Sequence, residues 1–478
     1  MAGDPMHRRT FGRLAFGGMV AAAVAAPKER PAPRSGRVNV LEYGATANGA
    51  ALDTRAIQAA VDACAQAGGG TVCFPPGRYL SGTIVLRGNV GLHLEPGAVL
   101  LGSRNLADYP SHVPAMRSYT DNYTERCLIY AEKAENIAIT GLGAIDGQGA
   151  AFGVGAPYKQ RPFLIRLIEC RNVTVADVTL RDSPMWVLHL LGCDDAAIRA
   201  VRVRSRVNHN NDGFDIDCST RVRVSDCDIW SGDDAIVLKS TSSRPARDVT
   251  IVNCVLSSLC NALKMGTESN GGFENIVIGN CTIHETKLAG LALEIVDGGT
   301  LDRVAVSNLV MNGVGAPLFL RLGNRARPFL EGGSPQPVGR MRNIAISNIE
   351  AAGAGRTWCA ISGIPGHAIE SVTFDNVRIR SLGGGTAADA GRQPPELESA
   401  YPEHSMFGVL PAYGFYCRHA KNLRLRNVEI AAENREERPA LVCEDVDGLE
   451  LDGCRLQAPA GDQPAMRLRD VRGERIRA

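Results

Sequence analysis

Short segments in which apolar and polar residues alternate recur along this chain at a nearly constant spacing. Asn172–Val175 and Arg303–Val306 are examples, each opening on a polar residue and carrying Val at every second position. Such alternation is typical of strands that bury one face. Successive segments place their first apolar residue at Val222, Val249, Ile276 and Val304, which are 27, 27 and 28 residues apart.

A fixed period of roughly twenty to thirty residues indicates a solenoid, in which each coil stacks on the one before it. The pattern returns near the C-terminus at Ile344, Val372, Leu423 and Leu449. Helical repeats would instead show apolar residues at every third or fourth position. We therefore predict an all-β chain that forms one right-handed parallel β-helix over residues 38–478. Coils stacked at about 4.8 Å would place residues one period apart side by side.

Two regions depart from this repeat. The sequence predicts an N-terminal cap and the first coils over 38–110, with an amphipathic helix at Thr54–Ala67 that covers the open end of the stack. Thr54 is the expected N-cap, and the apolar stripe of the helix consists of Ile57, Val61 and Cys64. Residues 383–415 are rich in Gly, Pro and acidic residues, and we expect them to form a long loop beside the working face.

The segment 1–26 resembles a twin-arginine export signal. Arg8 and Arg9 are closely followed by Phe and then by a short, weakly apolar Gly/Ala run. We expect cleavage near Ala25 or Ala26, a linker over 27–37, and a periplasmic or secreted mature protein. A disordered basic tail is the alternative interpretation.

Net charge and cysteine placement exclude several classes of protein. The 478 residues carry a formal net charge of +1, which gives no electrostatic footprint for nucleic acid. The sequence has no run approaching the roughly 18 consecutive apolar residues of a membrane span. Several of the 14 cysteines fall within strand-like repeats, so we expect mostly free, buried thiols, and their spacing is not that of metal ligands. We expect a monomer.

Three acidic residues lie one repeat apart in the middle of the chain. Asp212, in Asn211-Asp212-Gly213, precedes Asp233 by 21 residues, and Asp234 follows directly. Stacked coils would bring these side chains together, as hydrolysis of a glycosidic bond by paired carboxyl groups requires. Crowding would raise the pKa of one acid and keep it protonated as a proton donor. Asp-Gly and Gly-Asp-Asp are also ordinary turn sequences, but their occurrence one coil apart favours catalysis.

The motifs Asn210-Asn211-Asp212-Gly213 and Gly232-Asp233-Asp234 lie within 171–240. This stretch resembles the polygalacturonase family, glycoside hydrolase family 28, and parts of 38–109 and 143–149 resemble the N-terminal region of that family. The resemblance implies Asp233 as general acid and Asp212 with Asp234 as activators of the water. It also implies inversion at the anomeric carbon and neither a metal nor a cofactor. Asp215 and Asp217 share a strand face, and we expect them to support these acids.

Two further signatures of that family, Gly-His-Gly and Arg-Ile-Lys, are missing. Alignment puts Asn261 where the His is expected, with Ala292 and Glu294 at the Arg and the Lys. In the family those basic residues hold the galacturonate carboxylate, so hydrolysis is better supported than homogalacturonan as the substrate. The candidate substrate-binding residues are His209, Asn261, Lys264, Glu268, Glu294, Arg321 and Arg325. Trp186 and Trp230 are expected in the core rather than against sugar.

The leading hypothesis is a secreted, metal-independent inverting glycoside hydrolase. It would act on pectin-type polysaccharide or its side chains, or on oligosaccharides derived from them. A second hypothesis is a pectate-lyase-like elimination on the same scaffold, which requires calcium. A third is a β-helical carbohydrate-binding protein without activity, which the absent signatures favour and the three acids oppose.

Overall fold

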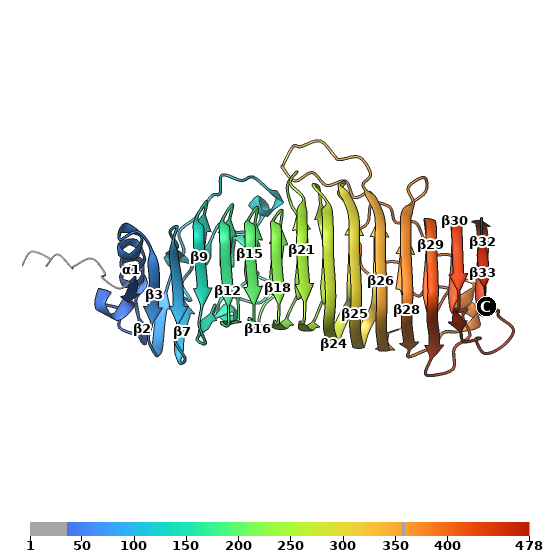
Figure 1. Ribbon diagram of the computed structural model, residues 1–478, viewed down its shortest axis with the longest axis horizontal. Coiled ribbons are helices and arrows are strands. Elements are labelled where there is room, and N and C mark those ends of the chain that lie inside the picture. Colours follow the sequence, from blue (N-terminus) through green and yellow to red (C-terminus); the bar gives the residue numbers. More distant parts are fainter. Residues whose placement is uncertain (1–35, 356–358, 478) are drawn as a thin grey trace, which may run out of the picture. The chain divides into compact units, whose positions relative to one another are not determined.

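A computed structural model describes residues 36–355 and 359–477 of the chain. The predicted export signal and nearly all of the predicted linker lie outside these residues. The described residues belong to one compact unit, Pro33–Ala478. Within this unit parallel strands stack coil upon coil along one axis (Figure 1). The predicted parallel β-helix is confirmed.

The coils build three parallel ladders of strands, which merge into longer strands from β24 onward. The first ladder contains β1 (Arg37–Asn39), β3 (Gly70–Phe74), β6 (Val90–Leu94), β9 (Glu135–Thr140), β12 (Arg171–Ala176), β15 (Asp194–Arg199), β18 (Thr220–Ser225) and β21 (Ala246–Val252). The second contains β2 (Asn48–Leu52), β4 (Gly77–Ser81), β7 (Ala98–Gly102), β10 (Ala144–Asp146), β13 (Thr179–Arg181), β16 (Arg202–Ser205), β19 (Asp228–Ser231) and β22 (Val255–Ser258). The third contains β5 (Ile84–Val85), β8 (Cys127–Glu132), β11 (Phe163–Ile168), β14 (Leu188–Leu191), β17 (Phe214–Asp217), β20 (Ile236–Ser240) and β23 (Leu263–Ser269).

The remaining strands continue the stack towards the C-terminus. They are β24 (Phe273–Ile295), β25 (Thr300–Leu322), β26 (Arg340–Ala354), β27 (Cys359–Ser362), β28 (Ile369–Ser381), β29 (Phe415–Ala432), β30 (Leu441–Asp452), β31 (Arg455–Leu456), β32 (Met466–Arg472) and β33 (Arg475–Arg477). The segment 382–414 between β28 and β29 contains only the short helix α2 (Ala387–Ala390).

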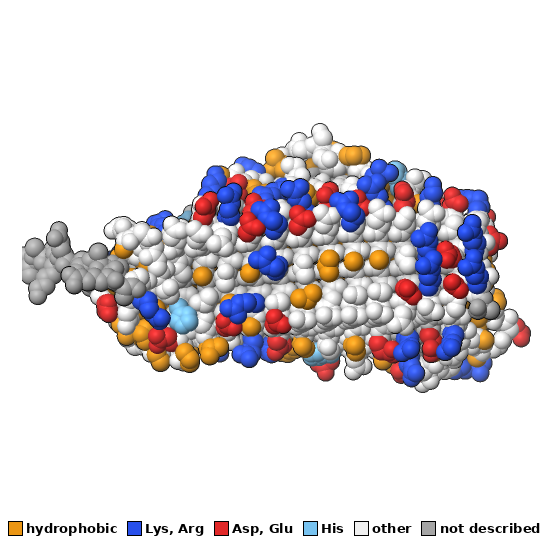
Figure 2. Space-filling model, in the orientation of Figure 1, with side chains coloured by type: hydrophobic (Ala, Val, Ile, Leu, Met, Phe, Trp, Pro, Cys, Tyr) orange, Lys and Arg blue, Asp and Glu red, His pale blue; other side chains and the backbone are white. Residues whose placement is uncertain are grey.

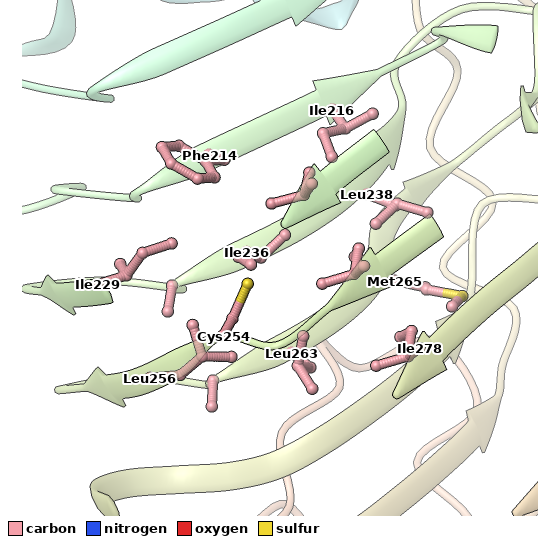
Figure 3. Packing of buried hydrophobic residues seen from close by; sticks show 14 of the residues in the cluster. Phe214, Ile216, Ile229, Ile236, Leu238, Cys254, Leu256, Leu263, Met265 and Ile278 are labelled. Carbon is pink, nitrogen blue, oxygen red and sulfur yellow. The ribbon is translucent and has the colours of Figure 1, made fainter. Parts of the chain in front are cut away.

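The strand register follows the apolar repeat of the sequence. Val222 pairs with Val249, which pairs with Ile276 and, one coil further, with Val304. Inside the coils the same alignment stacks apolar side chains: Phe214, Ile236 and Leu263 lie above one another (Figure 3). Burying each such side chain contributes roughly 1.5–3 kcal/mol, so the stacked core is the main stabilising element.

Asparagines at the corners of the coils form a second ladder. Asn280, Asn308, Asn348 and Asn376 all have positive φ values between 52° and 56°, which Asn adopts more readily than other residues with a side chain. The Nδ2 of Asn308 donates to Oδ1 of Asn280 at 2.8 Å, and that of Asn376 to Asn348 at 2.8 Å. The corner residue that permits the turn therefore also joins neighbouring coils.

The predicted N-terminal helix is present as α1 (Thr54–Gln66), with Ile57, Val61 and Cys64 all buried. The prediction of Thr54 as its N-cap was wrong, because Asp53 occupies that position. The Thr54 hydroxyl instead accepts a hydrogen bond from the Gly82 amide at 2.8 Å, which ties the helix to the coil beneath it. The side chain of Asp53 accepts hydrogen bonds from Thr46.

All 14 cysteines are free thiols, and twelve of them are buried, as predicted. Among the described residues, helices long and apolar enough to cross a membrane are absent. On the face drawn in Figure 2, Lys and Arg side chains gather over the C-terminal coils. Two cations of the C-terminal strand β29 are paired with an acid of β30: Arg426 and Arg424 lie 2.9 and 3.5 Å from the carboxylate of Glu450.

Candidate active site

The stacking of coils places Asp212 and Asp234 at equivalent positions on neighbouring turns. Phe214 of β17 pairs with Ile236 of β20, and the Gly213 amide donates to the Asp234 carbonyl at 2.9 Å. Asp212 and Asp234 each lie two residues before these paired positions, at the edge where the third ladder begins. The convergence of the acids that the sequence predicts is thus a consequence of register.

Asp212, Asp233 and Asp234 line one hollow with a cavity volume of ≈ 200 Å³. Its other charged residues are Lys239, Glu268 and Arg327. Its aromatic lining consists of Tyr119, Tyr123, Tyr158, Trp186 and Tyr401. Acids, paired cations and aromatic faces in one small concavity are typical of a site that holds a sugar ring.

Lys239 is the central cation of this hollow, and the sequence did not single it out. Its Nζ lies 3.9 Å from Asp212, 3.7 Å from Asp215 and 3.6 Å from Glu268. Burial would lower the pKa of this ammonium, but Glu268, Asp212 and Asp215 raise it well above its ordinary value. The sequence feature that could have identified Lys239 is its position on β20, since the stacking of coils pairs it with Asp217 of the acidic strand β17.

The three acids differ in protonation. Burial, and then the charge of Asp233, raise the pKa of Asp212 well above its ordinary value. Burial, and then the charge of Asp234, raise the pKa of Asp233. For Asp234 burial acts in the same sense, yet Lys264 and Lys239 outweigh it and the pKa is lowered. The cluster therefore combines a carboxyl group that ionises more readily with neighbours that keep their protons to higher pH, which is the arrangement that acid/base catalysis needs.

Asn261 and Lys264 act on Asp234 rather than on a ligand. The backbone N and Nδ2 of Asn261 both donate to Oδ1 of Asp234, at 3.1 and 2.8 Å. Lys264 Nζ lies 3.2 Å from Oδ2 of Asp234 and 3.7 Å from the carboxylate of Glu294. Asn261, Lys264 and Glu294 are buried and do not line the hollow. Their prediction as substrate-binding residues is corrected to a positioning role.

Glu268 lines the hollow, as a substrate-binding residue should, but it is occupied by two cations. Its carboxylate pairs with Lys239 at 3.6 Å and with Arg327. Arg325, also predicted to bind substrate, pairs with Asp297 and donates to the Thr267 hydroxyl. Arg325 is outside the lining of the hollow.

Aromatic residues from the segment 118–126 cover one side of the hollow. Tyr119 opens the 3₁₀ helix η3 (Tyr119–Asn122), and Tyr123 follows it. This segment is fixed by the fully buried Arg166, whose guanidinium donates to the Thr120 hydroxyl at 2.9 Å and to a backbone carbonyl at Thr124 at 3.1 Å. The loop that carries the two tyrosines is therefore tied to β11 from inside the fold.

Arg321 holds another loop and does not bind substrate, which corrects the prediction made for it. Its side chain is 1% exposed and donates to the Ser362 hydroxyl and to carbonyl oxygens of Gly363, Glu396 and Leu397. The carbonyls at Glu396 and Leu397 belong to 382–414, the same segment that carries Tyr401 to the hollow. The sequence could not distinguish a buried anchor from a binding arginine, because the alternation Leu320-Arg321-Leu322 places the side chain on the outer strand face in either case.

A second, wider hollow with a cavity volume of ≈ 540 Å³ adjoins the first and shares Tyr158, Asn210 and Asp233 with it. His209, a predicted substrate-binding residue, is exposed and lines this hollow together with Arg206. It was not evident from the sequence that Arg206 lies here.

The two tryptophans occupy different environments. Trp186 is 3% exposed and packs in a buried cluster, although its ring also lines the smaller hollow. The prediction that Trp230 lies in the core was wrong, because 41% of it is exposed. The Arg206 guanidinium lies 3.9 Å above its ring centre, which makes Trp230 a platform for that cation.

Asp217, which we expected to support the acids, is fully buried. It accepts hydrogen bonds from the Thr241 hydroxyl at 2.5 Å and the Thr241 amide at 3.0 Å. His189 Nε2 lies 3.3 Å from Asp217, and burial lowers the pKa of this imidazole to about 4, so the ring is neutral. Asp215 instead faces Lys239.

Asp233, Asp234 and Cys260 could together hold a metal ion, since their potential ligand atoms lie within 4.8 Å of one another. Burial, and then Asp234 and Asp233, raise the pKa of the Cys260 thiol far above its ordinary value, which keeps the thiol protonated. Calcium takes oxygen ligands. These three residues therefore fit a calcium-dependent elimination poorly.

Comparison with known proteins places this site in context. The family model "Glycosyl hydrolases family 28" matches residues 74–394. A probable polygalacturonase of Vitis vinifera is 29% identical over 268 residues, covering 51% of this chain and 54% of that protein. An exo-poly-alpha-D-galacturonosidase of Dickeya chrysanthemi is 25% identical over 303 residues, covering 52% and 50%.

The same fold is found among solved structures. That of a hyperthermoactive exopolygalacturonase from Thermotoga maritima superposes with a TM-score of 0.67 at 21% identity, covering 84% of this chain and 93% of that one. The chain spans about half the length of the two curated relatives it matches.

Proposed function

The chain belongs to glycosyl hydrolases family 28, and on that premise we propose that it hydrolyses a glycosidic bond of pectic polysaccharide. The observation that carries this proposal is the stacking of Asp212 against Asp234, with Asp233 beside them in a hollow lined by aromatic rings. A protein that only binds sugar has no need of three crowded carboxyl groups, two of which, Asp212 and Asp234, are buried at a cost in desolvation.

The acids divide the work as follows in this proposal. Asp233, with a raised pKa, donates a proton to the glycosidic oxygen as general acid. Asp234, with a lowered pKa, accepts a proton from the attacking water, and Asp212 orients that water. Attack on the face opposite the leaving group gives inversion at the anomeric carbon.

Substitution of the acid tests this assignment. Asp233→Asn should lower kcat on pectic oligosaccharides by about 10²–10⁴-fold, the typical contribution of general acid–base catalysis, and leave folding intact. Asp226→Asn makes the same change at an exposed corner of the same coil and should retain full activity. Full activity of the Asp233 variant would refute the role.

The nature of the products separates the alternatives. Inverted anomers observed by NMR at early times support hydrolysis. Unsaturated products and loss of activity with a chelator would indicate elimination instead. Binding without any product across homogalacturonan, rhamnogalacturonan and their oligomers would indicate a protein without activity.

Export is a separate proposal. We propose that residues 1–26 direct the folded protein through twin-arginine export, on the evidence of Arg8 and Arg9. Replacing both by Lys should retain the protein in the cytoplasm in a cell fractionation experiment. Export of that variant at the wild-type level would contradict the proposal.

A further inference from the structure

The two hollows that meet at Asp233 have different functions in cleavage. The smaller hollow contains Asp212 and Asp234, which act on the anomeric carbon, and therefore holds the sugar that is attacked. Asp233 lines both hollows and protonates the oxygen between them, so the wider one holds the leaving group. This assignment rests on the proposed function.

Among the described residues, every cation at the smaller hollow already has a carboxylate partner. Lys239 is shared by Asp212, Asp215 and Glu268, all within 3.9 Å. Arg327 pairs with Glu268 and lies 3.9 Å from Asp297. Neither cation is therefore free to bind a further anion. A sugar carboxylate entering this hollow would have to compete with Glu268 and Asp297 for these cations, which disfavours a uronate here.

Behind this hollow the covering loops contact one another. The Arg327 guanidinium lies 3.6 Å above the ring of Tyr119, which joins 323–339 to 118–126. The Asn324 amide donates to the Glu398 carbonyl at 2.6 Å, which joins the first of these segments to 382–414, the loop that carries Tyr401. The volume of ≈ 200 Å³ lies below the roughly 300–1,000 Å³ of sites for larger ligands. One ring fits, and a continuing chain does not.

Within the part of the chain that the structure describes, the wider hollow contains a cation that is not paired in this way. Arg206 lies on Trp230 and is oriented by hydrogen bonds to the Ser231 carbonyl at 2.9 Å and the Ser257 hydroxyl at 2.8 Å. Among the described residues it has no carboxylate within 4.0 Å, and Glu285, the acid that most affects its pKa, lies beyond that distance. His209 lines the same hollow. A half-buried, oriented guanidinium without an acid partner suits a carboxylate ligand.

We propose that the enzyme removes one neutral sugar from a chain end at which the next residue is a uronate. The neutral ring occupies the smaller hollow, against tyrosine faces and away from further carboxylates. The uronate occupies the wider hollow, with its carboxylate on Arg206. The substrate class is therefore a mixed glycan of neutral sugars and uronates, rather than a homopolymer of uronate.

A set of four oligosaccharides tests this directly on the wild-type protein. The terminal residue is either a hexose or its C6-oxidised uronate, and the next residue varies in the same way. We expect kcat/KM for the neutral–uronate member to exceed that for each of the other three by at least about tenfold. Released products should be single sugars. Preference for a uronate at the terminal position, or release of internal fragments, would overturn the inference and leave hydrolysis standing.

Two variants localise the effect. Arg206→Gln should remove the preference for a uronate leaving group, so that kcat/KM for the neutral–uronate member falls to that for the neutral–neutral member. Glu268→Gln frees part of the charge of Lys239 and Arg327, and should shift terminal preference towards the uronate by about tenfold or more. Glu331→Gln, an exposed residue of the same covering loop as Arg327, is the matched control and should shift neither.

Binding to the Asp233→Asn variant separates failure of the inference from failure of the proposed function. If the wild type hydrolyses none of the four compounds but the variant binds the neutral–uronate member at least about tenfold more tightly than the others, hydrolysis is overturned, and the assignment of a neutral ring and a uronate to the two hollows stands. If none is hydrolysed and none is bound preferentially, both are overturned.

Discussion

Asn261 holds Asp234 through two hydrogen bonds to a single oxygen. The backbone N and the side-chain Nδ2 both donate to Oδ1, and the Asn261 Oδ1 accepts from the Ala289 amide at 3.0 Å. Because the Ala289 amide can only donate, it fixes which end of the Asn261 side chain faces the carboxylate. The Asn261 side chain, on the next coil, thus stabilises the ionised form of Asp234.

Replacing this amide should impair catalysis through the pKa of Asp234. Asn261→Ala removes one of the hydrogen bonds that lower that pKa, so the pKa rises and the acidic limb of the pH–rate profile moves to higher pH. Hydrogen bonds to charged groups are worth about 1.5–3 kcal/mol, which predicts a loss of about ten- to hundredfold in kcat/KM at neutral pH. An unchanged acidic limb would contradict the role. Asn270→Ala, on the next loop of the chain, is a control with no contact to Asp234.

Lys264 supports the same carboxylate by charge. Burial acts to raise the pKa of Asp234, and Lys264 is the strongest influence in the opposite direction. Lys264→Met should therefore raise that pKa and move the acidic limb further than Asn261→Ala does, because a full charge is removed rather than a dipole. Lys287→Met, at an exposed position, is the control. The pH–rate profiles of wild type, Lys264→Met, Asn261→Ala and Lys287→Met are compared. An acidic limb of Lys264→Met at the same pH as that of wild type would rule the charge effect out.

Glu294 makes the stability of the protein depend on pH. Burial raises the pKa of Glu294 from 4.5 to about 8, although Lys264 opposes this. The folded state therefore binds a proton that the unfolded state has released between these pH values, and stability falls as pH rises through this window. Glu294→Gln removes the proton linkage and keeps the shape. Its free energy of unfolding relative to wild type should be flat below pH 4.5 and should rise towards pH 8.

Denaturant unfolding at several pH values measures this difference. Burial also raises the pKa of Glu403 to about 7, which gives both proteins a common slope, so only the difference between them is diagnostic. Glu285→Gln, at an exposed position, is the matched control. A constant difference for Glu294→Gln would contradict the prediction.

The sequence predicted those parts of the molecule that depend on the repeat. The stacking of coils that pairs Val222 with Val249 also pairs Phe214 with Ile236 and so places Asp212 level with Asp234, which means that fold and acid cluster follow from one architecture. The residues that line the hollow opposite the acids were less predictable, because loops distant in the sequence supply them. Tyr401 and Arg327 reach the hollow from segments with no repeat to fix their register, and no local pattern marks them.

Charge alone also misled the prediction for residues inside the coils. Arg321 and Lys264 were expected to bind substrate, and both are buried with protein partners. On an outward strand position, a cation that binds ligand and one that satisfies a neighbouring coil have the same local sequence. A cation is paired within the protein where the neighbouring coils place carboxylates or carbonyls beside it. The strand register shows these neighbours, and the local sequence does not.

Arg321 offers the sharpest test of how the loops are held. Arg321→Met removes the donors to the Glu396 and Leu397 carbonyls, and each hydrogen bond from a charged group is worth about 1.5–3 kcal/mol. The free energy of unfolding should fall by about 3 kcal/mol, and limited proteolysis should cut within 382–414 before any other segment. KM should rise because Tyr401 leaves the wall of the smaller hollow. Arg392→Met, on the exposed side of the same loop, should change none of these, and equal protease resistance of the two variants would show that the loop is held by other contacts.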